Sequence, residues 1–332
     1  MNQSSSTEHG ASAPAAPSAH PYRAFAIRAG LGVALVAVLL WRHDARPILR
    51  ILSRERADCF AAAVVLYLAG QVLSSYRWKL LAAMLKMDGR YREFLAYYFI
   101  GVFTNLFVPG LLGGDAAKSV YLARRHGRMG EAIASVVADR GVGLLGLVWL
   151  AALAALFLNF TPLPPSVIIP TVAAGAISLA GFLASPLLAR MLHLMPRPIR
   201  RAGGLVAPYL HNPAALAVPI ALSIVLQTAM ATSQYLLAVG LGLTVPLSLF
   251  ILCVPIANVF ASLPLTLNGL GIRESAYLLL FGMAGMRNED AIALGLLWFA
   301  ATAVGGLTGA IAFVSTPSSR AADGEGQITN LM

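Results

Sequence analysis

The chain has 332 residues, of which 58% are apolar and only 11% are charged, and its mean hydropathy is +0.75. This composition excludes a soluble globular protein, because its polar residues could not cover so much hydrocarbon, and it predicts an all-α, polytopic membrane helix bundle. The net charge of +10 would suit nucleic acid, but in so apolar a chain it indicates basic cytoplasmic loops and contact with anionic lipid headgroups, with no nucleic-acid partner.

The two ends of the chain differ from the rest. Residues 1–22 are rich in Ser, Ala and Pro without an apolar run, so we expect a disordered tail and not a signal peptide, and residues 317–332 read the same way. Residues 23–316 are predicted to form one transmembrane domain. Cys59 and Cys253 lie in or beside apolar spans, where we interpret them as small buried hydrophobes, and we expect no metal or cofactor.

Apolar runs follow along the chain, and six of them have the roughly 17 to 25 residues that a helix needs to cross a bilayer. These six predicted spans are Ala24–Trp41, Asp58–Tyr76, Ile133–Phe157, Val167–Leu188, Leu216–Leu241 and Ala291–Val314. Two more apolar segments, Phe94–Gly113 and Leu247–Leu267, are interrupted late by Pro and Gly. We predict that both broken segments are re-entrant: they enter the membrane, turn and return on the same side.

Basic residues near the span ends predict the orientation, because Lys and Arg are retained in the cytoplasm. Residues 77–92, 118–128 and 190–201 carry five, four and four bases, whereas residues 159–165 and 242–246 carry none. The first broken segment should therefore enter from the cytoplasm and the second from the periplasm, with the amino terminus cytoplasmic. The five arginines of Arg42–Arg56 oppose this topology, and we interpret that stretch as an amphipathic interfacial helix.

The two broken segments share the pattern P-x3-[GN]-G-x3-[KR], repeated 155 residues apart. The first copy consists of Pro109, Gly113, Gly114 and Lys118, and the second of Pro264, Asn268, Gly269 and Arg273. A full span precedes and follows each copy, and the charges give the copies opposite orientations. The sequence therefore predicts an inverted repeat, about 58–158 and 214–314, in which broken helices meet near the midplane around a transport site.

The breaks predict the chemistry of that site. Irregular backbone at membrane depth is tolerated only beside protein or a watery cavity, and glycines there leave N–H groups outward at the positive ends of the following helices. Together with bases about one turn further on, this arrangement suits an anion such as phosphate. The predicted binding set is Lys118, Arg140, Arg273, Gly113, Gly114, Asn268, Gly269 and Gly271, with Pro109 and Pro264 as structural breaks.

Three acids accompany these bases. We expect each of Asp115 and Glu274 to cap a helix or to neutralise a base: Asp115 as an amino-terminal helix cap, and Glu274 as a partner of Arg273 or another base. The alternative is that one of the two acids carries a proton that drives transport. Asp139 and Arg140 point about 100° apart on a helix, so each should find a partner on a neighbouring helix, or Arg140 a lipid headgroup.

Other polar residues have simpler interpretations. Arg77–Trp78, at the end of a predicted span, is interpreted as an interfacial anchor. Asn105 and Asn258, which precede the two prolines, are interpreted as helix-to-helix contacts and not as ligands.

Three stretches, "VPGLLGGDAAKSVYLARR", "ADRGVGLLGL" and "LPLTLNGLGIRESAYLLL", resemble the flippase-like transmembrane domain of the lysylphosphatidylglycerol synthase family. The resemblance covers about Phe25 to Val314. It implies a bacterial inner-membrane domain that moves lipids or lipid-linked intermediates between leaflets. In full synthases an aminoacyl-transferase domain follows; none is expected here. Lys118 stands where the family usually has arginine, and Asn268 where it usually has glycine. These two differences affect which headgroup we expect the site to bind, and not the expected architecture.

We therefore expect a lipid translocase that binds an anionic phospholipid or a lipid-linked phosphate, and not an enzyme. One rival is an accessory membrane protein that binds lipid and partners a lipid- or envelope-modifying enzyme. The other is an intramembrane enzyme with Asp115, Asp139 or Glu274 as acid or base, which is disfavoured because no histidine lies in a predicted span. A homodimer or an envelope-enzyme partner is compatible with the first two hypotheses.

Overall fold

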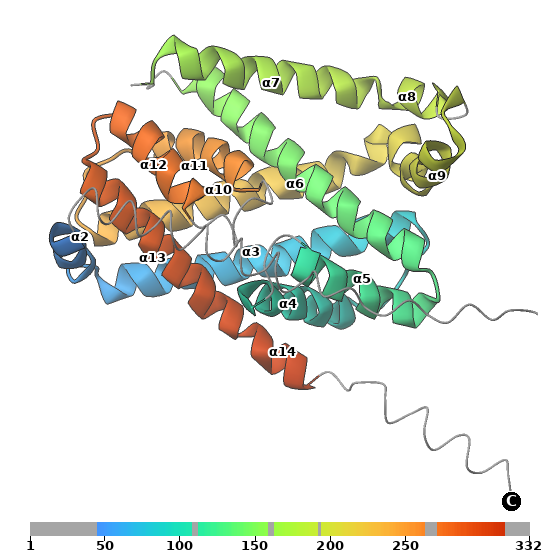
Figure 1. Cartoon of the computed structure of the whole chain (residues 1–332), viewed down its shortest axis with the longest axis horizontal. Helices are drawn as coiled ribbons and strands as arrows, with labels where there is room; N and C mark the ends of the chain where they lie inside the picture. The colour runs from blue at the N-terminus through green and yellow to red at the C-terminus, as the bar shows by residue number, and fades with distance from the viewer. Residues whose placement is uncertain (1–44, 108–111, 159–162, 192–193, 263–270, 316–332) are drawn as a thin grey trace, which may run out of the picture.

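The chain is helical throughout the part that the structure, a computed structural model, describes: residues 45–107, 112–158, 163–191, 194–262 and 271–315 (Figure 1). Within these ranges there is no strand. The elements are α2 (Ala45–Leu52), α3 (Ala57–Met84), α4 (Tyr91–Phe107), α5 (Leu112–His126), α6 (Met129–Phe157), α7 (Pro165–Leu183), α8 (Ser185–Met191), α9 (Arg197–His211), the short 3-10 helix η2 (Pro213–Leu216), α10 (Ala217–Gly240), α11 (Leu247–Ala261), α12 (Ile272–Met283), α13 (Asn288–Leu307) and α14 (Gly309–Ser315).

Five helical stretches of the described chain are long and apolar enough to cross a membrane, which confirms a multi-pass membrane protein. They correspond to α3, α6, α7, η2 with α10, and α13 with most of α14. The predicted span Ala24–Trp41 lies outside the described residues. The predicted span Val167–Leu188 is divided, because α7 ends at Leu183 and α8 continues from Ser185 after a break at Ala184.

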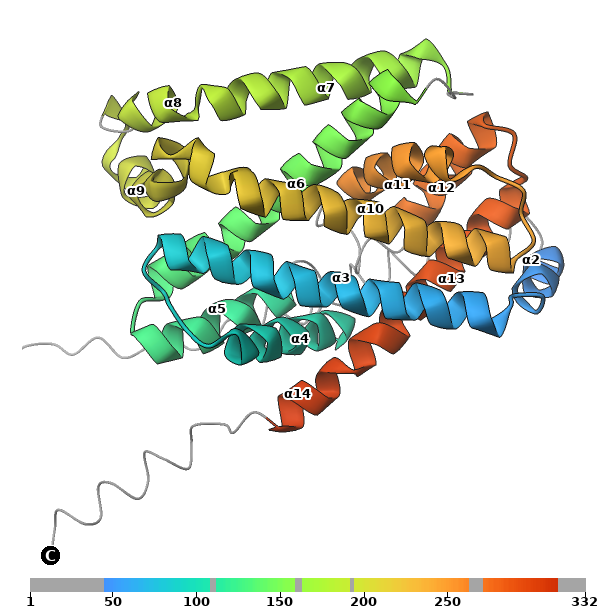
Figure 2. The same ribbon diagram turned by 180° about the vertical axis from the view of Figure 1, so that it is seen from behind.

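Helices α3 and α10 pack antiparallel along the middle of the molecule, as both views show (Figure 1, Figure 2). Near the start of α3 the Arg56 backbone N–H donates to the Gly240 carbonyl at the end of α10. Further along, the Ser233 hydroxyl donates to the Ala63 carbonyl over 2.7 Å. The carboxyl ends of α3 and α10 therefore lie at opposite ends of the bundle.

Two hairpins of short helices follow these two carboxyl ends. Helices α4 and α5 pack against each other after α3, and α11 and α12 do so after α10, so the hairpins open toward opposite ends of the bundle (Figure 1). The four helices have 17, 15, 15 and 12 residues. At 1.5 Å per residue they are about 18 to 26 Å long, which is less than the roughly 30 Å hydrocarbon layer. Their entry from opposite membrane faces stays a prediction.

Each hairpin also packs against the last span of the other half. Helix α11 of the second hairpin lies along α6, and α4 of the first hairpin lies along α13 and α14. At the second of these contacts, Gly309 touches the backbone of Phe99. Two copies of one unit related by a two-fold axis would exchange contacts in this way, but the inverted repeat itself stays a prediction.

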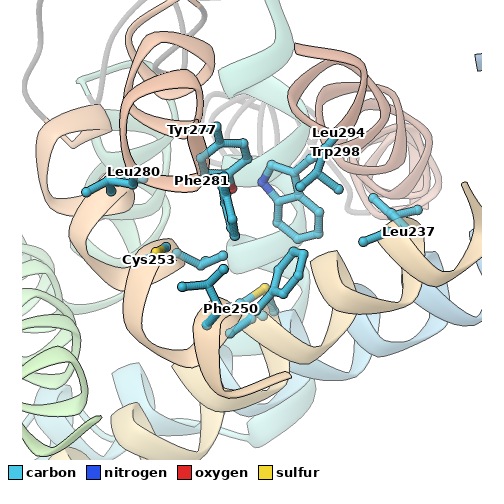
Figure 3. Packing of buried hydrophobic residues seen from close by; sticks show 14 of the residues in the cluster. Leu237, Phe250, Cys253, Tyr277, Leu280, Phe281, Leu294 and Trp298 are labelled. Atoms are coloured by element: carbon cyan, nitrogen blue, oxygen red, sulfur yellow. The ribbon is translucent and has the colours of Figure 1, made fainter. Parts of the chain in front are cut away.

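The largest buried apolar cluster fills the space between the second hairpin, α10 and α13 (Figure 3). Rings from three helices meet there: Phe250 of α11 and Phe281 of α12 have centroids 4.9 Å apart, and Trp298 of α13 packs beside them. The free Cys253 is buried in the same cluster, as predicted for a small hydrophobe. This packing fixes the start of α12, which carries Arg273 and Glu274.

Two peripheral helices lie across the ends of the bundle. In the stretch interpreted as amphipathic, α2 forms and buries Ile48 against Ile292 of α13. At the other end α9 is seen end-on in Figure 1, nearly perpendicular to the long helices, and the Tyr209 hydroxyl ties it to α3 by donating to the Leu81 carbonyl over 2.8 Å.

Candidate functional site

The close crossing of α4 and α5 sets the position of the first charged motif. A Cβ at Gly114 would clash with the carbonyl oxygen of Gly101, so only glycine permits these backbones to touch. The Gly114 N–H donates to the Asn105 side-chain oxygen over 2.8 Å, which confirms Asn105 as a helix-to-helix contact.

This geometry corrects the prediction that the chain turns through Gly113 and Gly114. Helix α5 already begins at Leu112, so both glycines lie in its first turn. The Gly114 N–H, predicted to point outward at a ligand, is instead occupied by Asn105. The close approach of Gly101 explains the difference: the glycines are needed for packing between helices rather than for a loop.

Asp115 bridges α5 and α6. One carboxylate oxygen lies 2.9 Å from the Lys118 ammonium, and the other accepts a hydrogen bond from the Arg140 Nε over 2.7 Å. The interpretation of Asp115 as a helix cap is therefore wrong. Its carboxylate is drawn to two bases at once, and in a buried setting a charged partner compensates a carboxylate better than a neutral N–H.

Asp139 holds the other side of the cluster. The Arg77 guanidinium donates from Nε to the Asp139 Oδ1 over 2.9 Å, and the Lys118 ammonium lies 3.9 Å from Oδ2. Arg77 also donates to the Ser223 hydroxyl of α10, which in turn donates to the Val142 carbonyl. Asp139 and Arg140 thus find partners on neighbouring helices, as the sequence predicted.

Arg77 is the residue of the cluster that the sequence analysis missed. It was interpreted with Trp78 as an interfacial anchor, which is wrong, because both side chains are buried. The apolar run ends at Tyr76, but α3 continues to Met84, so Arg77 lies inside the helix. The signal was Asp139 itself, since an acid within a span requires a base on a neighbouring helix.

Aromatic rings complete the enclosure of Lys118. Its ammonium lies 4.7 Å from the ring centroid of Tyr98 and 5.6 Å from that of Trp78, both within cation–π range. With two carboxylates on its other sides, Lys118 is held in the wall of the cluster and is buried.

Arg140 is the base of the cluster that remains accessible. Its side chain is 41% exposed, and among the described residues only its Nε has a partner, Asp115. The two terminal nitrogens of its guanidinium therefore form a planar fork with four N–H groups available to a ligand, the geometry that recognises phosphate.

The second hairpin carries the counterpart motif. The Gly271 N–H donates to Glu274 Oε2 over 2.6 Å and closes the first turn of α12, and the backbone of Gly271 has φ 84°, which favours glycine. Glu274 therefore caps the helix. It is fully buried against Gly295 of α13, where a Cβ would lie 2.7 Å from the Glu274 Cγ.

The two motifs lie in different parts of the molecule. Asp115, Lys118, Asp139 and Arg140 come together, whereas the buried Arg273 lies at the start of α12. Four predicted residues fall outside the described residues: Pro109, Pro264, Asn268 and Gly269.

The chemistry of this arrangement is ionic recognition. In the described part of the chain, no group of three or more His, Cys, Asp or Glu side chains is placed to hold a metal ion. What the site offers is a cluster that contains more bases than acids, with one guanidinium only partly engaged.

Comparison with known proteins assigns the chain to a family. The profile of the family described as the lysylphosphatidylglycerol synthase TM region matches residues 25–309. The chain belongs to this family. As a member of the lysylphosphatidylglycerol synthase TM-region family it is a lipid-related membrane protein. The five residues of the charge cluster, with Arg273 and Glu274 of the second motif, all lie within the matched range. No curated protein and no solved structure matches this family member.

Proposed function

We propose that this protein moves an anionic phospholipid, or a lipid linked to a polyprenyl phosphate, between the leaflets of a bacterial inner membrane. The observation that supports the proposal most strongly is the half-exposed guanidinium fork of Arg140 at the edge of a buried charge cluster. In this proposal the phosphate of the headgroup binds that fork while the tails stay in the bilayer.

The depth of Arg140 along its helix favours this role. Arg140 lies seven residues after the start of the predicted span Ile133–Phe157, or about 10 Å along the helix axis, and so within the hydrocarbon layer. A base inside that layer costs up to about 2.5 to 3.5 kcal/mol on insertion scales, so it needs either full pairing or a function. Arg140 is paired through one of its three nitrogens only, among the described residues.

The rest of the cluster has a positioning role in the proposal. Arg77 and Lys118 hold the two aspartates, and Asp115 orients the Arg140 guanidinium through Nε so that its fork stays open. Without these pairs either carboxylate would repel an incoming phosphate.

Transport also requires a second contact, which the headgroup meets as it crosses the membrane. We assign it to Arg273, at the start of α12 in the hairpin that opens toward the opposite end of the bundle. The headgroup would pass from one hairpin to the other by small motions of the two halves, with no covalent chemistry by the protein.

Lipid movement in proteoliposomes tests the proposal. The variant Arg140→Gln removes the fork, and Arg128→Gln is its matched control, because the Arg128 side chain is 42% exposed and also pairs with one carboxylate, that of Glu131. We expect wild type and Arg128→Gln to move labelled phosphatidylglycerol at similar rates. The rate for Arg140→Gln should be at least about tenfold lower, because the variant removes a pair of charge-assisted hydrogen bonds.

Two results would count against transport. If wild type moves phosphatidylglycerol and polyprenyl phosphate no faster than protein-free vesicles, the accessory-protein hypothesis becomes the better one. If Arg140→Gln moves lipid as fast as Arg128→Gln, Arg140 is not the binding base.

A further inference from the structure

The link between α2 and α3 carries an acid that the proposed lipid site does not use. Glu55 follows the end of α2 and precedes the start of α3. Its side chain as a whole is only partly buried, but both carboxyl oxygens are buried, and neither has a hydrogen-bond partner. A buried carboxylate without a partner is strongly disfavoured, so this position requires a physical explanation.

The carboxyl group of Glu55 lies against the last residue of α10. A Cβ at Gly240 would clash with both carboxyl oxygens, so only glycine leaves room for them. The main chain is held on both sides: the Glu55 N–H donates to the Leu52 carbonyl of α2, and the Arg56 N–H donates to the Gly240 carbonyl. Glu55 therefore lies where the end of α2, the start of α3 and the end of α10 meet (Figure 2).

The immediate surroundings of Glu55 favour the neutral acid. The adjacent Arg56 does not pair with it, because the Arg56 guanidinium lies 2.6 Å from the Asp58 carboxylate instead. The last turn of α10 has no ionisable side chain, and its carbonyl groups form the negative end of that helix. An ionised Glu55 would thus face buried surface, a helix carboxyl end and a second acid.

Other ionisable groups lie on the elements around this link, and none of the described ones forms an ion pair with Glu55. They are Arg50 of α2, Arg54 of the link, Cys59 of α3, and Arg287, Glu289 and Asp290 at the start of α13. Arg287 and Asp290 pair with each other. The side chains of Arg42, His43, Asp44 and Arg46 lie outside the described part of the chain.

Helix α2 depends on the bundle for its stability. It has eight residues, too few for a stable helix in isolation. A small apolar cluster holds it, in which Ile48 packs with Ile292 of α13 and beside Leu278 of α12. The contact of Glu55 with Gly240 is a second point of attachment, so its loss would loosen the whole of α2.

We infer that Glu55 is a proton-operated latch, which holds α2 on this end of the bundle while its carboxyl group is neutral and releases α2 when the group ionises. Ionisation would draw the carboxylate into water, and the link would leave Gly240 with it. In the predicted topology this end faces the periplasm, so the latch would respond to pH outside the cytoplasm. The inference does not depend on lipid transport, because it involves neither Arg140 nor Arg273.

The direction of the response follows from the proton affinity of the acid. Burial, with a smaller contribution from Asp58, raises the pKa of Glu55 from 4.5 to about 7. A group whose folded-state pKa is raised stabilises fully below its ordinary pKa and loses this contribution as the pH rises through the raised one. The latch should therefore be closed at pH 6 and largely released at pH 8.

Hydrogen exchange of the full chain in a neutral detergent, corrected for the intrinsic exchange rate at each pH, tests the latch. Between pH 6 and pH 8, we expect the protection of α2 amides in wild type to fall about fivefold more than that of α6 amides. Glu55→Gln cannot ionise and should keep α2 protected at both pH values. The matched control is Asp58→Asn, which removes a nearby exposed acid and should keep most of the wild-type response.

Gly240→Ala is a second variant that tests the geometry of the latch. The added methyl group displaces the carboxyl group of Glu55, so α2 should exchange rapidly at both pH values, without a pH response. If the protection of α2 falls in Glu55→Gln as it does in wild type, another group titrates and the latch is overturned. Equal protection of wild-type α2 at both pH values would also overturn it.

Discussion

The Arg77 guanidinium and the Asp139 carboxylate form an ion pair in which both side chains are almost completely buried, with Nη2 2.8 Å from Oδ1. The pair joins α3 to α6 inside the membrane bundle, and Ser223 of α10 adds a third helix to it. Three of the long helices therefore meet at one buried pair, next to the proposed lipid site.

Removal of one partner from this pair should be strongly destabilising. Arg77→Met leaves the Asp139 charge with only Lys118, 3.9 Å away, and we expect a loss of about 3 to 5 kcal/mol in the free energy of unfolding. The double variant Arg77→Met/Asp139→Leu removes both charges and should lie closer to wild type than either single variant. Denaturant unfolding in detergent would measure this, and a double variant that loses the sum of both single losses would contradict the pairing.

The crossing of α4 and α5 gives a second stability prediction. Gly114→Ala places a methyl group against the Gly101 carbonyl and 2.7 Å from the Asn105 side chain, and we expect a loss of about 1 to 3 kcal/mol through overpacking. The control is Gly141→Ala in α6, where no atom lies within 4 Å of the added carbon and better helix propensity should stabilise by up to about 1 kcal/mol. In thermal unfolding, the unfolding temperature should fall for Gly114→Ala and rise for Gly141→Ala. A change in the same direction for both variants would contradict a tight crossing of α4 and α5.

Glu55, between α2 and α3, predicts a pH dependence of stability. Burial of its carboxyl, with a smaller contribution from Asp58, raises the pKa of Glu55 to about 7. Since the folded-state pKa is raised, the folded protein binds this proton more tightly than the unfolded chain. Its stabilising contribution is complete below pH 4.5 and is lost as the pH rises through 7.

We expect the free energy of unfolding to fall by about 1 kcal/mol as Glu55 ionises. This is less than the full 1.36 kcal/mol per pKa unit, because solvent screens a partly exposed carboxyl group. Glu55→Gln, which cannot ionise, should remove that part of the decline between pH 5 and pH 8. Unfolding temperatures at several pH values would measure it. A variant whose curve runs parallel to wild type would show that Glu55 is not the titrating group.

Much of the fold could be predicted from the sequence, because the bilayer constrains it. Long apolar runs have few alternatives to helices in lipid, and the five spans found in the described chain coincide with predicted ones. The same constraint predicted that Asp139 and Arg140 would each bind a neighbouring helix, since neither charge can face lipid.

The identity of the partners could not be predicted, because it depends on which helices meet. Arg77 reaches Asp139 only because α3 extends past the apolar run and crosses α6 at this point. Asp115 has the local sequence of a helix cap, but Arg140 and Lys118 are close enough to outcompete the backbone for its carboxylate. Glu274 does cap its helix, because its Oε2 accepts a hydrogen bond from the Gly271 N–H.

The fork of Arg140 is the feature on which the proposed lipid site depends, and a comparison of Arg140→Lys with Arg140→Gln tests it most directly. Lysine keeps the charge but loses the two parallel N–H donors, so it separates geometry from charge. The measurement is the initial rate of phosphatidylglycerol movement in proteoliposomes as a function of the fraction of that lipid. We predict that Arg140→Lys needs about tenfold more lipid to reach half of its maximal rate, and that Arg140→Gln is slower at every fraction. Wild-type kinetics in both variants would contradict the assignment of the phosphate to Arg140.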